Sequence, residues 1–271
     1  LLEGRIVERP HPRFEGVETT QGSVGLGVVS IEREDLFQEP TGVLDGSRGL
    51  GRAIALALAA PGRRIAILGR HRDGLELTAK ALQAGGAEAL VIEGDLTRGT
   101  DRAAAAQAID AAWGGLDILV NNAGAGAYKP FLEHDPAEID AIVAVNLTGL
   151  IQLTHALLPL IERDGGGHIV NIASDVGRRP IANMAPYVAA KHGVVGFSHA
   201  LRLELRPRGI KVGVILPGII DTGFNNSVEG SRPGASALRP ADVAAAVVAM
   251  LSQPVNGQID ELTVHPMGQD A

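Results

Sequence analysis

The chain has 271 residues, 45% of them apolar and 20% charged, so it is long enough to bury one large core. Its formal net charge is −7 and it contains no long Lys/Arg run, which argues against binding to nucleic acid or to an anionic membrane surface. It has no Cys, and its eight His residues show no ligand-like spacing, so we expect neither disulfides nor a metal site. The first thirty residues lack a secretory pattern and no apolar run approaches roughly 20 residues, which predicts a cytoplasmic protein.

The N-terminal part of the chain differs from the rest in composition. Residues 1–38 are charged, contain scattered Pro and Gly, and resemble a strand only over residues 24–31. We therefore expect an N-terminal extension over residues 1–38, without a core of its own, followed by one domain over residues 39–271.

From about Arg63 onward, short apolar runs alternate with helical patterns, which is typical of βαβ units. The predicted strands are residues 64–68, 89–92, 116–120, 168–173, 211–216 and 261–264. The predicted helices are residues 73–84, 102–113, 136–160, 186–206 and 240–251, the third of them broken near Asn146. Because crossovers between parallel strands are right-handed, this order predicts an α/β fold: a single-domain Rossmann-type doubly wound parallel sheet with helices on both faces.

Two side chains of the predicted helix 186–206 can share a site. Tyr187 and Lys191 stand at positions i and i+4, which places them on one face of the helix. A nearby ammonium favours the phenolate and lowers the pKa of a tyrosine from its ordinary value of about 10, which would make Tyr187 a usable general acid and base. Taken alone, this spacing is also common in solvated surface pairs.

Polar residues follow two of the predicted strands. Ser174 ends an apolar strand, at the carboxyl edge of the sheet where open α/β sheets bind ligands. The block Asn121-Asn122-Ala123-Gly124 follows an earlier strand in an equivalent place. Asn146 lies inside a predicted helix, where Asn is a poor helix former and indicates a local break with a polar role.

These motifs together resemble the short-chain dehydrogenase/reductase family over about residues 43–265. The resemblance rests on the Asn-Asn-Ala-Gly block, Asn146, Ser174, the Tyr187/Lys191 pair, and Pro217-Gly218 leading to Thr222. It implies an oxidoreductase that moves a hydride between a nicotinamide cofactor and a carbonyl or secondary alcohol.

The resemblance also implies a role for each residue. Tyr187 would exchange a proton with the substrate oxygen, and Ser174 would hydrogen-bond that oxygen. Lys191 would bind the nicotinamide ribose and lower the pKa of Tyr187, while Asn146 would hold a water in a proton relay. The other expected cofactor contacts are Asp95 and Leu96 at the adenine, Asn122, Ala123 and Gly124 after their strand, and Pro217, Gly218, Ile220 and Thr222 along the nicotinamide.

A glycine-rich turn precedes the first predicted crossover. Its residues are Gly46, Ser47, Arg48, Gly49, Leu50 and Gly51. The amides of such a turn at the start of a helix can receive a pyrophosphate. The turn resembles the second half of the family fingerprint Gly-x-x-x-Gly-x-Gly, but Asp45 stands where the first glycine belongs. Because a carboxylate repels a pyrophosphate, we expect cofactor binding to be weaker than is usual in the family.

The strand expected before this turn has a poor sequence. Pro40 lies within residues 38–44, and a proline is disfavoured in a central parallel strand. Three interpretations remain: a truncated or rebuilt strand, its replacement by residues 24–31, or a damaged N-terminus.

The residues after the second strand of the domain bear on the choice of nicotinamide. Members of the family that prefer NAD carry an acidic residue there, and the position here is Gly69. Arg70 follows it, and Arg70 together with Arg48 could clamp a 2′-phosphate, although both could also be solvated. We therefore expect NADP(H) to be preferred, with NAD(H) possible.

The substrate loops are expected at residues 125–131, 175–184 and 223–239, with Tyr128, Met184 and Phe224 as apolar walls. Arg178 and Arg179 would be surface charges or would hold an acid. The C-terminal segment differs from the Asp-Gly-Gly ending of acyl-carrier-protein reductases. This difference favours a small-molecule substrate of the 3-hydroxy/3-oxo acid or ketone type.

Two further expectations concern function and assembly. Because the glycine turn departs from the fingerprint, the alternative function is a nucleotide-binding regulator or a catalytically impaired family member. Such a protein would bind the cofactor without hydride transfer. Family members pair through long helices, here residues 140–160 and 186–206, so we expect a homodimer or homotetramer.

Overall fold

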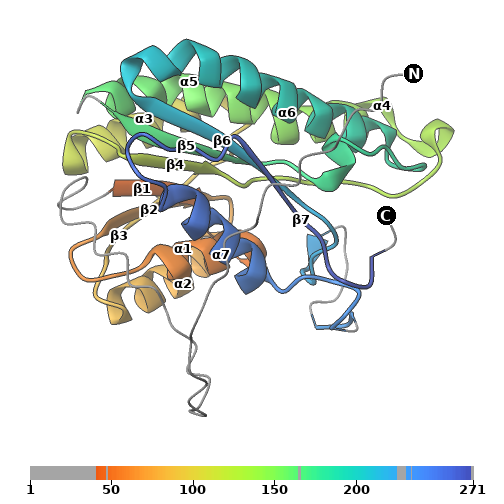
Figure 1. Cartoon of the computed structure of the whole chain (residues 1–271), viewed down its shortest axis with the longest axis horizontal. Coiled ribbons are helices and arrows are strands. Elements are labelled where there is room, and N and C mark those ends of the chain that lie inside the picture. Colours follow the sequence, from red (N-terminus) through yellow and green to blue (C-terminus); the bar gives the residue numbers. More distant parts are fainter. Residues whose placement is uncertain (1–40, 47, 164–165, 225–229, 233, 270–271) are drawn as a thin grey trace, which may run out of the picture. The chain divides into compact units, whose positions relative to one another are not determined.

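In the computed structural model, residues 41–46, 48–163, 166–224, 230–232 and 234–269 are described, all within one compact unit, Arg33–Ala271. These residues form a parallel sheet with the strand order β3-β2-β1-β4-β5-β6-β7 (Figure 1). The strands are β1 Thr41–Asp45, β2 Arg64–Gly69, β3 Glu88–Glu93, β4 Ile118–Asn121, β5 Gly167–Ile172, β6 Ile210–Pro217 and β7 Glu261–Val264. The strand order reverses between β1 and β4, and this is where such sheets open a crevice for a ligand.

Helices cover both faces of the sheet (Figure 1). One face carries α1 Gly49–Leu58, α2 Arg72–Ala84 and α7 Pro240–Leu251, and the other carries α3 Gly99–Trp113, α4 Pro136–Val143, α5 Gly149–Glu162 and α6 Ala185–Leu205. Short helical turns are η1 Phe131–Glu133, η2 Ala144–Thr148, η3 Asp175–Gly177 and η4 Arg206–Arg208. The predicted α/β fold with a doubly wound parallel sheet is therefore confirmed.

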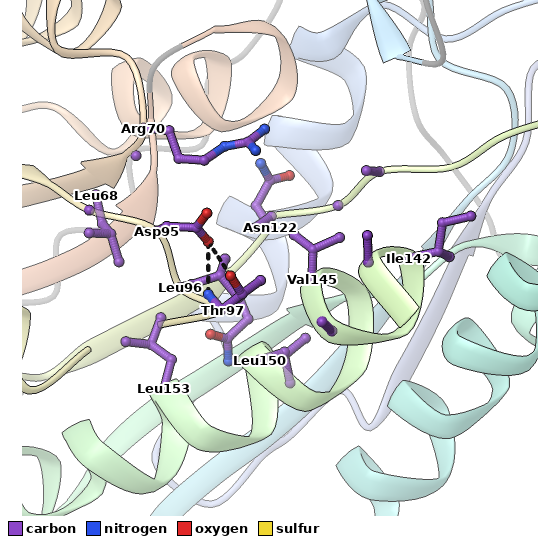
Figure 2. Close-up of a pocket in the computed structure, with 18 of the residues that line it drawn as sticks. Leu68, Arg70, Asp95, Leu96, Thr97, Asn122, Ile142, Val145, Leu150 and Leu153 are labelled. Carbon is purple, nitrogen blue, oxygen red and sulfur yellow. Dashed lines mark hydrogen bonds between the residues drawn. The ribbon is translucent and has the colours of Figure 1, made fainter. Parts of the chain in front are cut away.

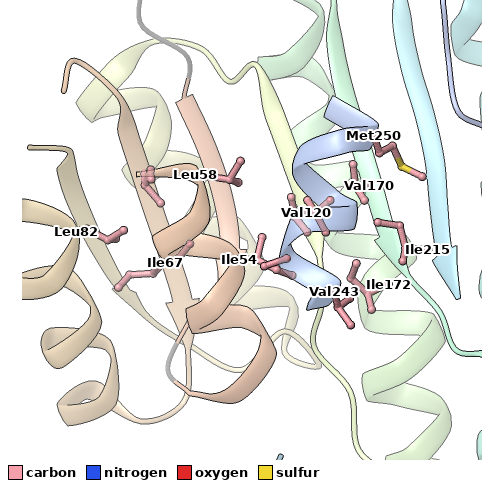
Figure 3. Close-up of a cluster of buried hydrophobic side chains, with 14 of the residues drawn as sticks. Ile54, Leu58, Ile67, Leu82, Val120, Val170, Ile172, Ile215, Val243 and Met250 are labelled. Atoms are coloured by element: carbon pink, nitrogen blue, oxygen red, sulfur yellow. The ribbon is translucent and has the colours of Figure 1, made fainter. Parts of the chain in front are cut away.

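The core lies on both sides of the sheet, which explains the continuous apolar runs of its strands. On one side, Ile54 of α1 and Val243 of α7 pack over Val120 and Ile172 (Figure 3). On the other side, Leu157 of α5 belongs to a second cluster of fully buried side chains. The whole of β5 is buried, so the chain that leaves it is held firmly at the edge of the sheet.

The first strand of the sheet is formed by Thr41–Asp45. Gly42 pairs with Ile65 of β2 and with Ile118 of β4, so β1 is a central parallel strand. Its described residues begin at Thr41, and Pro40 lies outside the described residues. The alternative in which residues 24–31 supply this strand is wrong. Residues 24–31 and the proposed extension 1–38 lie outside the described residues, so the predicted domain boundary stays a prediction.

The predicted break near Asn146 is confirmed. A π-helical turn, η2, interrupts the long helical run between α4 and α5. Such turns widen a helix by one residue and are frequent at functional sites.

The same run, Pro136–Glu162, is long and apolar enough by length and composition to cross a membrane. The expectation that no segment meets this criterion is therefore wrong. In the structure Leu150, Leu153, Leu157 and Leu160 of this run are buried, as in the core helix of a globular domain.

Candidate active site

Four predicted catalytic residues converge at the carboxyl edge of the sheet. Asn146 comes from η2, Ser174 follows β5, and Tyr187 and Lys191 lie one turn apart on α6. Asn146 is 0% exposed, Lys191 3% and Tyr187 8%. Their positions are therefore set by packing.

Lys191 is held by the backbone. Its ammonium donates to the carbonyl of Ile172 at 2.9 Å and lies 5.6 Å from the centroid of the Tyr187 ring. Burial lowers the pKa of Lys191 from 10.5 to about 8, because an ammonium loses its hydration in the interior. The side chain is thus cationic through most of the neutral range.

Asn146 offers an unused acceptor next to Lys191. Its amide group donates to the carbonyls of Ala125, at 2.6 Å, and Ile142, at 2.8 Å. Its Oδ1 is buried and has no hydrogen-bond partner among the described residues. A Cβ at Gly124 would lie 2.9 Å from this Oδ1 and 3.7 Å from the Lys191 Nζ, so the two groups border the same small space. A buried acceptor of this kind calls for a donor such as a water molecule.

Ser174 contacts both Tyr187 and its own neighbour in sequence, Asp175. Its hydroxyl donates to Asp175 Oδ1 at 3.1 Å, lies 3.5 Å from the carbonyl of Pro217, and forms a hydrogen bond with Tyr187. The backbone N–H of Val176 donates to the Ser174 Oγ at 3.4 Å. These bonds place the hydroxyl between Tyr187 and the end of β6.

The pKa of Tyr187 differs from the sequence-based expectation. Burial raises it above its ordinary value, the hydrogen bond with Ser174 lowers it, and the charge of Asp175 raises it. The expected net lowering by Lys191 is therefore wrong for this arrangement, because burial of the phenol dominates. Tyr187 is held as a neutral phenol, the form that can give up a proton.

The space beside Tyr187 has apolar walls. The Phe224 ring lies 5.5 Å from the Tyr187 ring, centroid to centroid. A Cβ at Gly126 would meet Phe224 at 3.0 Å and Met184 at 3.4 Å, so both predicted walls are present. Tyr128 is 60% exposed and lies at the surface.

The two arginines of the predicted substrate loop have other partners. Arg178 forms an ion pair with Glu261, at 2.6 Å, and belongs to the surface of the domain. Arg179 lies 3.5 Å from the buried carboxylate of Asp175.

A cavity of about 450 Å³ opens where the strand order reverses (Figure 2). The predicted cofactor residues that line it are Arg48, Arg70, Asp95, Leu96, Asn122, Ala123 and Gly124. In Figure 2 the Arg70 side chain extends over the cavity toward Asn122. Gly69, where NAD-preferring members carry an acid, is also part of the lining. His71, Thr97 and Val145 line the cavity too and were missed, although His71 and Thr97 directly follow predicted contacts in the sequence.

Asp95 is one of two acidic residues that line this cavity, the other being Glu138. It accepts hydrogen bonds from the backbone and the hydroxyl of Thr97, at 2.9 and 2.7 Å. Burial raises its pKa, but these bonds and the charges of Arg70 and Arg98 outweigh burial, so the pKa is lowered overall. Asp95 is therefore an ionised acceptor, suited to the amino or hydroxyl groups of a ligand.

The remaining predicted cofactor residues lie at the ends of β1 and β6. Gly46 is buried against Ile67, and Ser47 lies outside the described residues. A Cβ at Gly49 would lie 3.7 Å from Thr222, so the glycine turn touches the end of β6. The other members of these two groups are Leu50 and Gly51 in α1, Pro217 at the end of β6, and Gly218 and Ile220 after it.

Comparison with known proteins agrees with this geometry. The family model described as short chain dehydrogenase matches residues 42–232. The ketoacyl reductase HetN of Nostoc sp. is 36% identical over 204 residues, which are 74% of this chain and 71% of the relative.

Two solved structures extend the likeness to the fold. An alcohol dehydrogenase from the archaeon Thermococcus sibiricus, complexed with 5-hydroxy-NADP, superimposes with a TM-score of 0.81 at 29% identity, over 86% of this chain and 99% of that one. A variant of the actinorhodin polyketide ketoreductase with NADPH gives a TM-score of 0.77 at 29% identity, over 86% and 98%. The chain therefore belongs to the short-chain dehydrogenase/reductase family and is an oxidoreductase of that fold.

Proposed function

We propose that the protein is an NADP(H)-dependent oxidoreductase that transfers a hydride between the nicotinamide and a small ketone, 3-oxo acid or the corresponding secondary alcohol. One observation carries the proposal: Asn146, Tyr187 and Lys191 are buried together with the half-buried Ser174 at the carboxyl edge of the sheet. Gly124, which borders Asn146 and Lys191, also lines the cofactor cavity.

The residues of the cavity fit a nicotinamide with a 2′-phosphate. Arg48 and Arg70 are both exposed there and can bind an anion through charge-assisted hydrogen bonds. Gly69 presents no carboxylate that would repel it. The unpartnered Oδ1 of Asn146 fits the water of the proton relay. The two solved relatives with NADP-type cofactors support the same choice.

When bound, the nicotinamide supplies or accepts the hydride. The Tyr187 phenol gives its proton to the carbonyl oxygen as the oxygen becomes negative. The Ser174 hydroxyl turns from Asp175 to the same oxygen and stabilises its charge. The ammonium of Lys191 holds the ribose hydroxyls and stabilises the tyrosinate, and the Asn146 Oδ1 holds the water that returns a proton.

The apolar walls bear on the substrate. Phe224 and Met184 favour an uncharged group next to the reacting carbon, as in a ketone or a keto ester. The names of two relatives, a ketoacyl reductase and a polyketide ketoreductase, point the same way.

The alternative of a nucleotide-binding regulator now has less to support it. It rested on a poor first strand and on Asp45, and β1 is formed. The departure at Asp45 is the one remaining argument for the regulator.

Assembly through α5 and α6 is a second part of the proposal. Leu147 of η2, Ile151 of α5 and Phe197 of α6 are only partly buried, as expected for a face that a second copy covers. Light scattering on the purified protein should give a dimer or tetramer, and a 28.1 kDa monomer would contradict this expectation. The cytoplasmic location stays a prediction of the sequence.

The proposal is tested by titrating the protein with NADPH and NADH and following fluorescence. A panel of β-keto esters, diketones and aldehydes then reveals turnover through the loss of NADPH absorbance. In Tyr187→Phe, turnover should fall by about a thousandfold, while the Kd for NADPH changes by less than about threefold. Binding of NADPH without turnover of any carbonyl would favour the regulator, and failure to bind either cofactor would refute the proposal.

A further inference from the structure

The segment after β7 returns to the active site. There the side-chain amide of Gln269 bridges two parts of the site. Its Nε2 donates to Asp175 Oδ2 at 2.6 Å. Its Oε1 accepts from the backbone N–H of Ile219 at 2.9 Å.

The bridge depends on a close approach of the backbone. A Cβ at Gly218 would lie 2.3 Å from Gln269 Oε1 and 2.9 Å from His265 Cδ2. Any larger residue at position 218 would push the C-terminal segment away. The loop that carries the expected nicotinamide contacts is therefore shaped to receive Gln269.

Asp175 links Gln269 to Ser174 of the proposed catalytic centre. Its side chain is buried, with Oδ1 accepting from the Ser174 hydroxyl at 3.1 Å. Besides Gln269, its Oδ2 has only the longer contacts of His265, at 3.4 Å, and Arg179, at 3.5 Å, among the ion pairs of the described residues. The amide of Gln269 is thus its closest partner.

These bonds form one chain. It runs from Tyr187 through Ser174, Asp175 and Gln269 to the N–H of Ile219. One end is the proton donor and the other is the loop beside the expected nicotinamide. Among the described residues, the only other hydrogen bond between the two loops is the long one of Ser174 Oγ with the carbonyl of Pro217, at 3.5 Å.

We propose that Gln269 is a positioning residue: it locks the Ser174–Asp175 turn to the Gly218–Ile219 loop and so fixes the catalytic hydroxyls relative to the nicotinamide. The inference rests on the proposed function. It assigns to the C-terminal segment a role in the chemistry, although that segment adds little to the core. Met267, two residues earlier, is 98% exposed.

The test reverses the polarity of the bridge. In Gln269→Glu, two carboxylates face each other. In Asp175→Asn, two amides face each other, so that one N–H lacks an acceptor. The double variant restores each hydrogen bond of this chain: the new amide at position 175 accepts from Ser174 and donates to the new carboxylate at position 269, which still accepts from Ile219.

We expect kcat on a carbonyl substrate to fall about tenfold or more in each single variant, since each loses a hydrogen bond to a charged or buried group. The double variant should recover to within about threefold of wild type, and the Kd for NADPH should change by less than about threefold throughout, because most of its contacts are in the cavity. Met267→Ala is the matched control in the same segment and should leave kcat unchanged.

A second measurement does not depend on activity. In Gln269→Leu, hydrogen exchange at the Ile219 amide should accelerate by about tenfold, because the amide loses its acceptor. Unchanged exchange would overturn the bridge. Faster exchange in Gln269→Leu together with a kcat within twofold of wild type would overturn the positioning role of Gln269. The same conclusion would follow if the double variant had no higher kcat than the single variants. If the wild-type protein turns over no carbonyl, the proposed function has failed, and the exchange measurement still decides whether the bridge exists.

Discussion

The two ends of the site are built in opposite ways. At the catalytic end, Asn146 and Lys191 are buried and bonded to backbone carbonyls. At the adenosine end, Arg48 and Arg70 are exposed side chains on the rim of a cavity. If the proposed function holds, packing fixes the residues of the chemistry, whereas exposed charges set the choice of cofactor. Substitutions at the first end should have large effects on the reaction, and those at the second end should have smaller effects that depend on salt.

After Tyr187→Phe, the largest effect is expected from Ser174→Ala. Removing the hydroxyl takes away a hydrogen bond to the developing negative charge and should lower kcat by about a hundredfold to a thousandfold. The Kd for NADPH, measured by fluorescence, should stay within about threefold. An equal loss of binding and turnover would mean that Ser174 supports the fold of the site rather than the reaction.

The second prediction concerns the burial of Lys191. The pKa of Lys191 is lowered by burial from 10.5 to about 8 in the folded protein. Between about pH 8 and pH 10.5 the unfolded chain therefore keeps a proton on Lys191 that the folded protein has released. Stability should therefore rise with pH from about 8 to 10 by about 2 kcal/mol more than in Lys191→Met. Above about pH 10 the raised pKa of Tyr187 acts in the opposite direction, because the folded protein then keeps a proton that the unfolded chain loses. Urea unfolding of both proteins at each pH measures this difference, and parallel curves would contradict it.

At the adenosine end, Arg70→Ala should raise the Kd for NADPH by about tenfold and change the Kd for NADH by less than about twofold. The discrimination of the wild type should shrink as the salt concentration rises. An equal rise in the Kd for NADPH and for NADH would show that Arg70 contacts a part of the molecule that the two cofactors share. Arg163→Ala, at an exposed ion pair with Asp110, is a control that removes a guanidinium elsewhere.

The smallest effect is expected at the end of β1. Asp45→Gly removes a negative charge next to the turn that should receive the pyrophosphate and restores the family fingerprint. The Kd for NADPH should fall by about twofold to tenfold, less at high salt. An unchanged Kd would show that the carboxylate does not face the phosphates. The side chain of Asp45 lies outside the described residues, so this expectation comes from the sequence.

The sequence by itself determined the alternation of elements. Helix Pro240–Leu251 and strand Glu261–Val264 lie where they were predicted, and the break at Asn146 is a π-turn. It also determined the pairing of Tyr187 with Lys191, because helical spacing is a local property. Local periodicity and short motifs are enough for such features.

Only the tertiary structure decided the rest. The pKa of Tyr187 depends on burial, which no spacing reveals. The cavity is lined by residues that are far apart in sequence, such as Asp95 after β3 and Val145 in η2. The bond between Gln269 and Asp175 joins residues 94 positions apart. Such contacts depend on which segments the sheet order brings together, and that order is a property of the whole packed chain.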